Sequence, residues 1–132
     1  MSEPLTLRLL PERFAVCRLT SSEPVPSWAL VPAASLISFT RTEAELSLVS
    51  QQTMVPEGVQ AERDWRAFMV VGPLDFGLVG ILAGLTGVLA RAHIPVFVLS
   101  TFDTDYLLVK EVRVKETVTA FSEAGYSVET IV

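Results

Sequence analysis

The sequence contains one cysteine, Cys17, and one histidine, His93, in 132 residues. A single thiol cannot form an internal disulfide bond or a thiolate metal cluster, which is typical of proteins from a reducing compartment. Cys17 lies in an apolar stretch, where an unpaired cysteine usually serves as a small core residue. His93 follows apolar residues with helical spacing, so we expect it to cap a helix C-terminus rather than to catalyse a reaction.

Basic residues are also few, because 10 Lys and Arg stand against 15 Asp and Glu, which gives a net charge of −5. An acidic protein repels phosphate backbones and anionic lipid surfaces, so we expect no binding to nucleic acid or to a membrane. The most apolar region, residues 76–90, is too short to span a bilayer. The N-terminus lacks the basic and apolar pattern of a signal peptide, which predicts a cytoplasmic protein.

No familiar catalytic motif is present in the sequence. No serine, threonine or cysteine stands in a recognisable motif with a base and an orienting acid. The glycines between residues 72 and 84 match neither the dinucleotide fingerprint nor the phosphate-binding loop. Asp103 and Asp105 alone would make a poor metal site, and aspartates in hairpin turns usually cap their own backbone. We therefore expect no enzyme, no cofactor and no metal.

What the chain does have is apolar residues, which make up 50% of it and suffice for a folded core. In the second half, the spacing of the apolar residues predicts strands and helices in the order βαββαβ, which is the ferredoxin-like order. Gly125 has the right position to end the second helix. The expected elements are strands at 65–71, 95–101, 106–109 and 126–132, and helices at 78–93 and 111–124.

The first half favours strands, from Leu5 to Leu19, with Pro11 marking a bend or an edge position. Pro32 limits residues 27–31 to a short helical turn. Residues 36–42 and 45–50 predict a β-hairpin, and residues 53–64 a loop or a frayed helix. We take this last segment as the seam between two units, which gives units of residues 1–63 and 64–132.

The two halves also resemble each other. Residues 13–16 are similar to residues 66–70, and residues 38–42 are similar to residues 100–105. Chance similarity between strand-rich segments is the alternative, but the matching order of elements favours a repeat. The predicted fold is therefore α+β, with two ferredoxin-like units in tandem, antiparallel sheets and helices on one face. The first unit would have a shortened first helix.

Four segments, residues 9–19, 38–43, 72–76 and 100–106, resemble the small bacterial proteins with tandem ACT domains. Those proteins are similar to the ACT modules of aspartate kinase and of the cytosolic arginine sensors. The resemblance covers nearly the whole chain and is strongest from Trp65 onward. It implies a module that binds an amino acid or a related metabolite at an interface and regulates another protein.

The resemblance implies a ligand site where the first strand of the second ACT unit passes into its first helix. The N–H groups at a helix N-terminus attract a carboxylate, and glycines let a ligand approach the backbone. Asp105 aligns with an acidic residue that faces the basic end of the ligand in the arginine sensors. Asp75 or Asp105 would then hold an amino group or a cationic side chain. The expected site residues are Asp75, Phe76, Gly77, Val79, Gly80, Ile81, Thr101, Phe102, Asp103 and Asp105.

The arginine sensors have four ACT units in one chain and this sequence has two, so the resemblance implies a homodimer. The glycines and alanines of the helix at 80–90 are expected to let another backbone approach closely, in the same chain or in a second subunit. Two alternatives remain open. One is a protein-interaction module with a vestigial ligand site. The other is an enzyme on a fold that hosts many activities.

Overall fold

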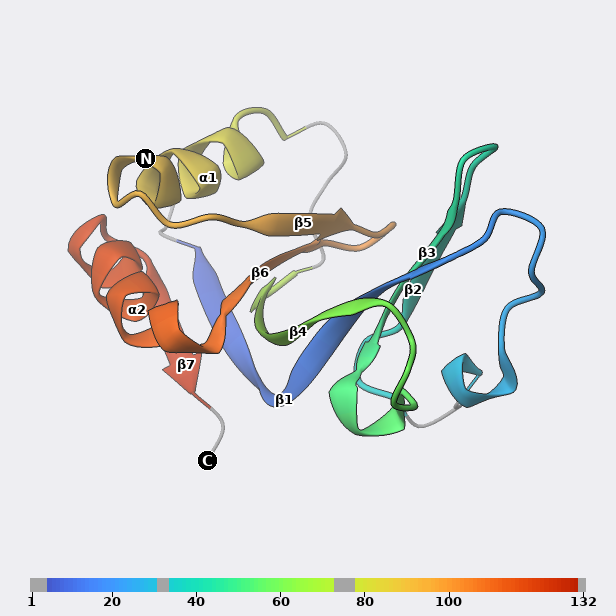
Figure 1. Cartoon of the computed structure of the whole chain (residues 1–132). Coiled ribbons are helices and arrows are strands. Elements are labelled where there is room, and N and C mark those ends of the chain that lie inside the picture. Colours follow the sequence, from blue (N-terminus) through green and yellow to red (C-terminus); the bar gives the residue numbers. More distant parts are fainter. Residues whose placement is uncertain (1–4, 31–33, 73–77, 131–132) are drawn as a thin grey trace. The chain divides into compact units, whose positions relative to one another are not determined.

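The computed structural model in Figure 1 describes residues 5–30, 34–72 and 78–130. The chain divides into two compact units. Unit 1 consists of Met1–Pro11 and Arg66–Val132, and unit 2 of Glu12–Trp65. The boundaries fall inside strand β1 (Thr6–Leu19) and strand β4 (Ala61–Val70), so each of these strands contributes residues to both units.

Unit 1 has the predicted βαββαβ order from β4 onward. After β4 come helix α1 (Ile81–Arg91), strands β5 (Phe97–Ser100) and β6 (Asp105–Lys110), the 3-10 turn η3 (Glu111–Arg113), helix α2 (Val114–Glu123) and strand β7 (Ser127–Thr130). The strand order in this unit is β7-β1-β4-β6-β5. Strand β7 pairs in parallel with the beginning of β1, from Thr6 opposite Ser127 to Leu9 opposite Thr130. The other end of the sheet is the antiparallel β5–β6 hairpin.

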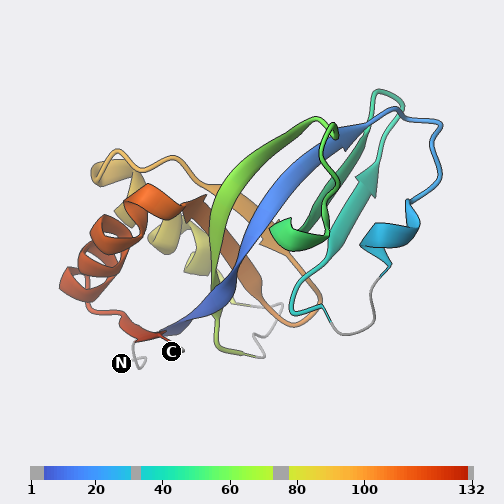
Figure 2. The same ribbon diagram turned by 60° about the horizontal axis from the view of Figure 1, so that its bottom comes forward.

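The core of unit 1 lies between one face of this sheet and both helices, which Figures 1 and 2 show beside the strands. Alternate residues of each strand point to this face, because successive side chains of a strand point to opposite sides. Phe121 of α2 packs edge-on against Phe68 of β4, with ring centroids 5.8 Å apart. The buried core residues are Leu7, Leu9, Phe68, Val70, Leu85, Val88, Leu89, Ile94, Leu107, Val109 and Phe121.

Helix α1 ends in a backbone cap at His93, which has a φ of 58° in the left-handed region. The N–H of His93 donates to the carbonyl of Ala90 at 3.1 Å, and the N–H of Ile94 donates to the carbonyl of Leu89 at 2.9 Å. This pair of bonds is the Schellman motif, in which a residue after the helix satisfies the last free carbonyls. His93 therefore closes the helix with its backbone.

The small residues of α1 meet a neighbour in the same chain at one position. A Cβ placed on Gly84 would lie 3.0 Å from the hydroxyl oxygen of Tyr126, which follows α2. The absence of a side chain at Gly84 thus gives Tyr126 its space within unit 1. Tyr126 also stacks edge-on with Phe121, with ring centroids 5.9 Å apart.

Unit 2 contains the rest of β1, the 3-10 turn η1 (Ser27–Ala29), strands β2 (Ser38–Arg41) and β3 (Leu46–Gln51), the 3-10 turn η2 (Gln52–Met54) and the beginning of β4. The strand order here is β2-β3-β1-β4. The predicted β2–β3 hairpin and the short turn at Trp28 are confirmed. Cys17 is buried in the core of this unit, as expected, and burial raises the pKa of its thiol, while the charge of Arg63 opposes that shift.

Two features of unit 2 differ from the prediction. Its described residues contain 3-10 turns but no α-helix, so both α-helices of the described chain belong to unit 1. The segment 53–64 is not a loop throughout, because β4 begins at Ala61, four residues before the expected strand at Trp65. The charged side chains at 62–64 break the alternation of apolar and polar residues that indicates a strand, so the start of β4 was not predicted.

Among the described residues, neither α-helix has the length and apolar character needed to cross a bilayer.

Candidate functional site

Unit 1 contains a hollow of about 330 Å³ between the N-terminus of α1 and the turn that joins β5 to β6. Binding pockets for small ligands usually measure roughly 300–1,000 Å³, so this hollow suits a small molecule. The residues that line it are Leu78, Gly80, Ile81, Leu82, Ala83, Ser100, Thr101, Phe102, Asp103, Thr104 and Asp105.

The helix side of the hollow is the first turn of α1. Gly80 precedes the helix with a φ of 81°, a left-handed conformation in which a side chain is strained, and no side chain caps the helix there. The first N–H to bond within the helix is that of Gly84, which donates to the carbonyl of Gly80 at 2.9 Å. The N–H groups of Ile81, Leu82 and Ala83 come before this bond and have no helical acceptor. This end of the helix therefore offers backbone donors and a partial positive charge.

The other side is a tight hairpin turn in which Ser100 pairs with Asp105. The N–H of Thr101 donates to the carbonyl of Thr104 at 2.8 Å, and the N–H of Thr104 donates to the hydroxyl oxygen of Thr101 at 3.2 Å. The hydroxyl of Ser100 donates to a carboxylate oxygen of Asp105 at 2.6 Å. Thr101, rather than an aspartate, thus caps this turn, and Ser100 orients Asp105.

The charges of the hollow are acidic. Among its described lining residues, Asp103 and Asp105 carry carboxylates, and none is Lys, Arg or His. Asp103 is exposed and Asp105 half-buried. Leu78 and Phe102 add apolar surface, with exposed fractions of 52% and 79%. The hollow thus combines donors for an anion, acceptors for a cation and contact area for an apolar group.

The structure brings most of the predicted site residues together. Gly80, Ile81, Thr101, Phe102, Asp103 and Asp105 all line the hollow. Val79 is not among the lining residues and is 92% exposed. The predicted residues Asp75, Phe76 and Gly77 lie outside the described part of the chain.

Sequence reasoning missed five of the lining residues, which are Leu78, Leu82, Ala83, Ser100 and Thr104. Leu82 and Ala83 had a signal, because the free N–H groups of a helix extend over its whole first turn. Ser100 precedes the predicted site residues and Thr104 lies between two of them, but serine and threonine are common in hairpins and carry no specific signal there.

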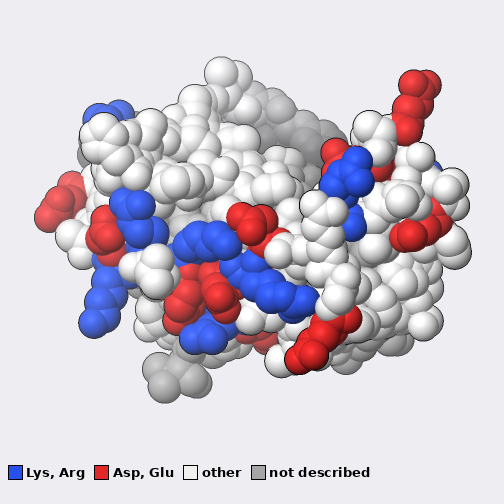
Figure 3. Space-filling model, in the orientation of Figure 1, with Lys and Arg blue, Asp and Glu red and all other residues white. Residues whose placement is uncertain are grey.

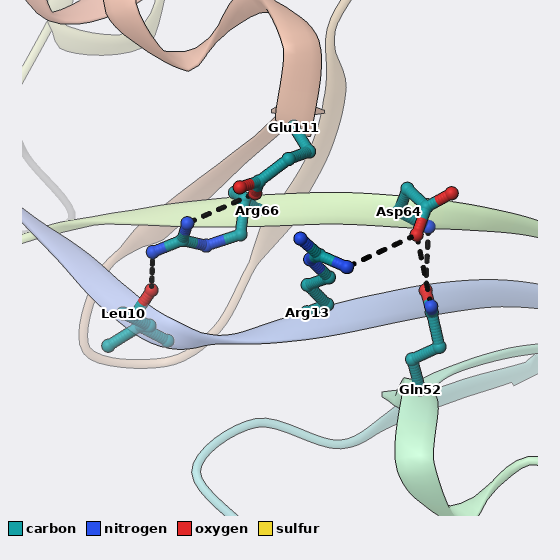
Figure 4. A network of polar contacts seen from close by, with 6 residues as sticks. All are labelled: Leu10, Arg13, Gln52, Asp64, Arg66 and Glu111. Carbon is teal, nitrogen blue, oxygen red and sulfur yellow. Dashed lines mark hydrogen bonds and ion pairs between the residues drawn. The ribbon is translucent and has the colours of Figure 1, made fainter.

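The other polar clusters of the described chain hold strands together. On the face in Figure 3, Lys and Arg alternate with Asp and Glu and form no patch of one sign. In unit 1, Arg66 pairs with Glu111 at 3.0 Å and donates to the carbonyl of Leu10 at 2.9 Å (Figure 4). In unit 2, Gln52 donates to a carboxylate oxygen of Asp64 at 3.0 Å. Among the described residues, no group of His, Cys, Asp and Glu is arranged to hold a metal ion.

The βαββαβ order of elements from β4 onward and the helix-covered face of unit 1 define an α+β domain, and residues 60–123 match the family model of the ACT domain. A second family model, described only as an N-terminal domain, matches residues 12–58. The protein Atu0741 from Agrobacterium tumefaciens is 32% identical, with 99% of this chain and 96% of that chain covered and a TM-score of 0.91. The chain therefore belongs to the same family as Atu0741, and its residues 60–123 are similar to the ACT domain.

Two aspartate kinase structures share the fold. The enzyme from Clostridium acetobutylicum is 14% identical, with 95% of this chain and 36% of that chain covered and a TM-score of 0.69. The regulatory subunit of aspartate kinase from Thermus thermophilus is 10% identical, with 89% and 95% covered and a TM-score of 0.63. No curated protein matches the sequence. The predicted resemblance to ACT domains and to those of aspartate kinase is confirmed at the level of the fold.

Proposed function

We propose that this protein is a regulatory module without catalytic activity that binds an amino acid or a closely related metabolite in the hollow of unit 1. The observation that carries this proposal is the meeting of a helix N-terminus and two carboxylates around a space of about 330 Å³. A zwitterion needs a donor group and an acceptor group a few ångströms apart, and the hollow offers both. The ACT-domain match supports a ligand-binding regulatory role.

In this proposal the ligand carboxylate accepts hydrogen bonds from the N–H groups of Ile81, Leu82 and Ala83. The ammonium group binds Asp105, which Ser100 orients, with Asp103 as the second acidic partner. A charge-assisted hydrogen bond contributes about 1.5–3 kcal/mol. The charge at a helix N-terminus adds about 0.3–2 kcal/mol. Together these contribute about 1.8–5 kcal/mol before the cost of association, a range that includes the roughly 4.1 kcal/mol of a 1 mM dissociation constant. Asp75, Phe76, Gly77 and Val79 remain part of the proposed site because the resemblance to ACT domains implies them.

The tandem arrangement, with units of residues 1–63 and 64–132, is also part of the proposal. The order of elements in unit 2 matches βαββαβ if its two 3-10 turns stand for the helices. Its strand order, β2-β3-β1-β4, is that of a ferredoxin-like sheet. Its hairpin turn repeats the bonds of unit 1, because the N–H of Thr42 donates to the carbonyl of Glu45 at 2.8 Å and the Thr42 hydroxyl oxygen accepts from the N–H of Glu45.

The proposed assembly is a homodimer in the cytoplasm. Leu78, Val79 and Phe102 expose apolar side chains on unit 1 around the hollow, with exposed fractions of 52%, 92% and 79%. Exposed apolar groups that cluster often mark a protein interface. Light scattering on a size-exclusion column measures the assembly, and a monomer at all concentrations would contradict this part of the proposal.

The same apolar residues favour one alternative, a protein-interaction module whose ligand site is vestigial. A sensor module should bind an amino acid, whereas an interaction module with a vestigial site should bind none. An enzyme is disfavoured because the hydroxyl of Ser100 bonds directly to the carboxylate of Asp105, and the described lining has no histidine or lysine base to activate it.

The test is a thermal-shift screen of all proteinogenic L-amino acids, followed by calorimetry. Asp105→Asn keeps the shape of the side chain and removes its charge, and we expect it to weaken binding at least about tenfold. Glu123→Gln on α2 is the control, since it makes the same charge change in the same unit but outside the hollow. The proposal fails if no amino acid binds below about 1 mM and Asp105→Asn changes nothing.

A further inference from the structure

The hairpin that carries Asp103 and Asp105 is tied to strand β4 by one buried hydroxyl group. Thr104 is only 8% exposed, although Phe102, two residues earlier in the same turn, is 79% exposed. Its hydroxyl donates to the backbone carbonyl of Val70, the last residue of β4, at 2.6 Å. The bond joins residues 34 positions apart in the sequence.

The backbone of Thr104 makes the other hydrogen bonds of the turn. Its N–H donates to the hydroxyl oxygen of Thr101 at 3.2 Å, and its carbonyl accepts from the N–H of Thr101 at 2.8 Å and from the Thr101 hydroxyl at 3.1 Å. The turn from Thr101 to Thr104 is therefore one cross-linked element. The bond to Val70 attaches this element to the end of β4.

Val70 belongs to the core that also holds the first turn of α1. Ile81 and Leu82, whose N–H groups face the proposed ligand, pack their side chains against that core. The hydroxyl of Thr104 thus connects the acidic side of the hollow to the structure that positions its donor side. A ligand bound at both ends requires the two sides to be held within roughly 0.5 Å of the productive spacing.

We infer that Thr104 is a positioning residue of the ligand site, whose hydroxyl bond to the Val70 carbonyl sets the spacing between the hairpin carboxylates and the first turn of α1. This inference rests on the proposed function. The bond acts through Asp103 and Asp105, which make the contacts with the ligand.

The test compares Thr104→Val, which keeps the shape but lacks the hydroxyl, with Thr104→Ser, which keeps the hydroxyl. Thr117→Val is the matched control. Thr117 is fully buried in α2 of the same unit, and its hydroxyl donates to the carbonyl of Arg113 at 2.8 Å. The Thr117→Val variant therefore loses an equivalent hydrogen bond outside the hollow. Comparison with it separates an effect of lost stability from an effect of lost positioning of the hairpin.

The first measurement is hydrogen exchange of the Thr101 amide by NMR, which needs no ligand. We expect Thr104→Val to speed this exchange about tenfold, as removal of a bond of ordinary strength would. Thr104→Ser and Thr117→Val should leave it close to the wild-type rate. Unchanged exchange in Thr104→Val would overturn the inference whether or not an amino acid binds.

The second measurement titrates each proteinogenic L-amino acid into all four proteins. We expect Thr104→Val to weaken the binding seen in the wild type about tenfold or more, and the other two variants to bind as the wild type does. Wild-type affinity in Thr104→Val, or equal weakening in Thr104→Ser, would overturn the positioning role. If the wild type binds no amino acid, the proposed function fails, and with it the ligand role of Thr104, while hydrogen exchange still reports whether the bond anchors the hairpin.

Discussion

Two glycines, one just before α1 and one inside it, should respond in opposite directions to the same change, glycine to alanine. Gly80 stands before the helix with a φ of 81°, and a Cβ there would meet nothing within 4 Å. Any penalty at Gly80 therefore comes from the backbone conformation and not from a clash. Gly87 lies inside the helix, where a Cβ would come no closer than 3.4 Å to the flexible end of Arg91.

The magnitudes follow from these two environments. A left-handed conformation costs a residue with a Cβ about 1–2 kcal/mol. The reduced freedom of alanine in the unfolded chain returns about 0.4–1 kcal/mol. Gly80→Ala should thus lower the free energy of unfolding by about 1 kcal/mol. Gly87→Ala should raise it by about 0.8–1 kcal/mol, the difference in helix propensity.

The assay is urea unfolding followed by far-UV circular dichroism, supported by melting temperatures. A change of about 1 kcal/mol moves the melting temperature of a domain of this size by roughly 4 °C, so the two variants should separate clearly. Equal stability of Gly80→Ala and the wild type would refute the left-handed start of α1. A loss of stability in Gly87→Ala would refute the open helix interior at that position.

Gly84 provides an internal check on the same reasoning. Its Cβ would stand 3.0 Å from the hydroxyl oxygen of Tyr126, so Gly84→Ala should be less stable than Gly87→Ala. Tyr126→Phe removes the crowding oxygen. The loss at Gly84 should therefore shrink when both changes are combined, and additive effects would show that the two residues do not interact.

Other changes test the ion pair, the thiol and the charge of the hollow. Glu111→Gln should cost about 1–2 kcal/mol in urea unfolding, because the half-buried Arg66 loses its negatively charged partner. Since the folded-state pKa of Cys17 is raised, its contribution to stability is constant below the ordinary thiol pKa and is lost as pH rises through the folded-state pKa. Raising the pH into the alkaline range should therefore lower the free energy of unfolding of the wild type more than that of Cys17→Ala. Aspartate and glutamate should bind weakest in calorimetry, because Asp103 and Asp105 repel a second carboxylate.

Much of unit 1 could be predicted from local patterns. Helical spacing placed α1 and α2 within a few residues, and the first of these starts later than expected because Gly80 is left-handed. The pairing of the N-terminal strand with β7 could not be predicted, since a parallel contact between residues 6–9 and 127–130 leaves no local signal. In unit 2, prolines at 24, 26 and 32 leave room only for the short turn that was predicted at Trp28, and the second helix position of the βαββαβ order is also a 3-10 turn.

The candidate site divides along the same line. The first turn of α1 could be predicted from the glycines at the start of the helix, and the acidic hairpin from its pair of aspartates. Thr104 was not, although it is the only described lining residue with a buried side chain. Its burial depends on the carbonyl of Val70, which reaches the hairpin only through the tertiary fold. A residue whose hydrogen-bond partner is a backbone atom on a distant strand cannot be recognised from a sequence motif or from hydrophobic periodicity.

The position of β1 leads to a prediction about where the chain can be divided. Leu7 and Leu9 are buried in the core of unit 1, with exposed fractions of 0% and 6%, and β7 has its parallel partner in residues 6–9. Burial of two leucines contributes about 3–6 kcal/mol, which is much of the 5–15 kcal/mol that holds a typical domain folded. A fragment of residues 64–132, although it contains a full βαββαβ order, should therefore not unfold cooperatively alone, and a peptide of residues 1–11 added in trans should restore a melting transition. Cooperative melting of the fragment without the peptide would mean that the N-terminal strand is an addition to the ACT unit and not part of its core.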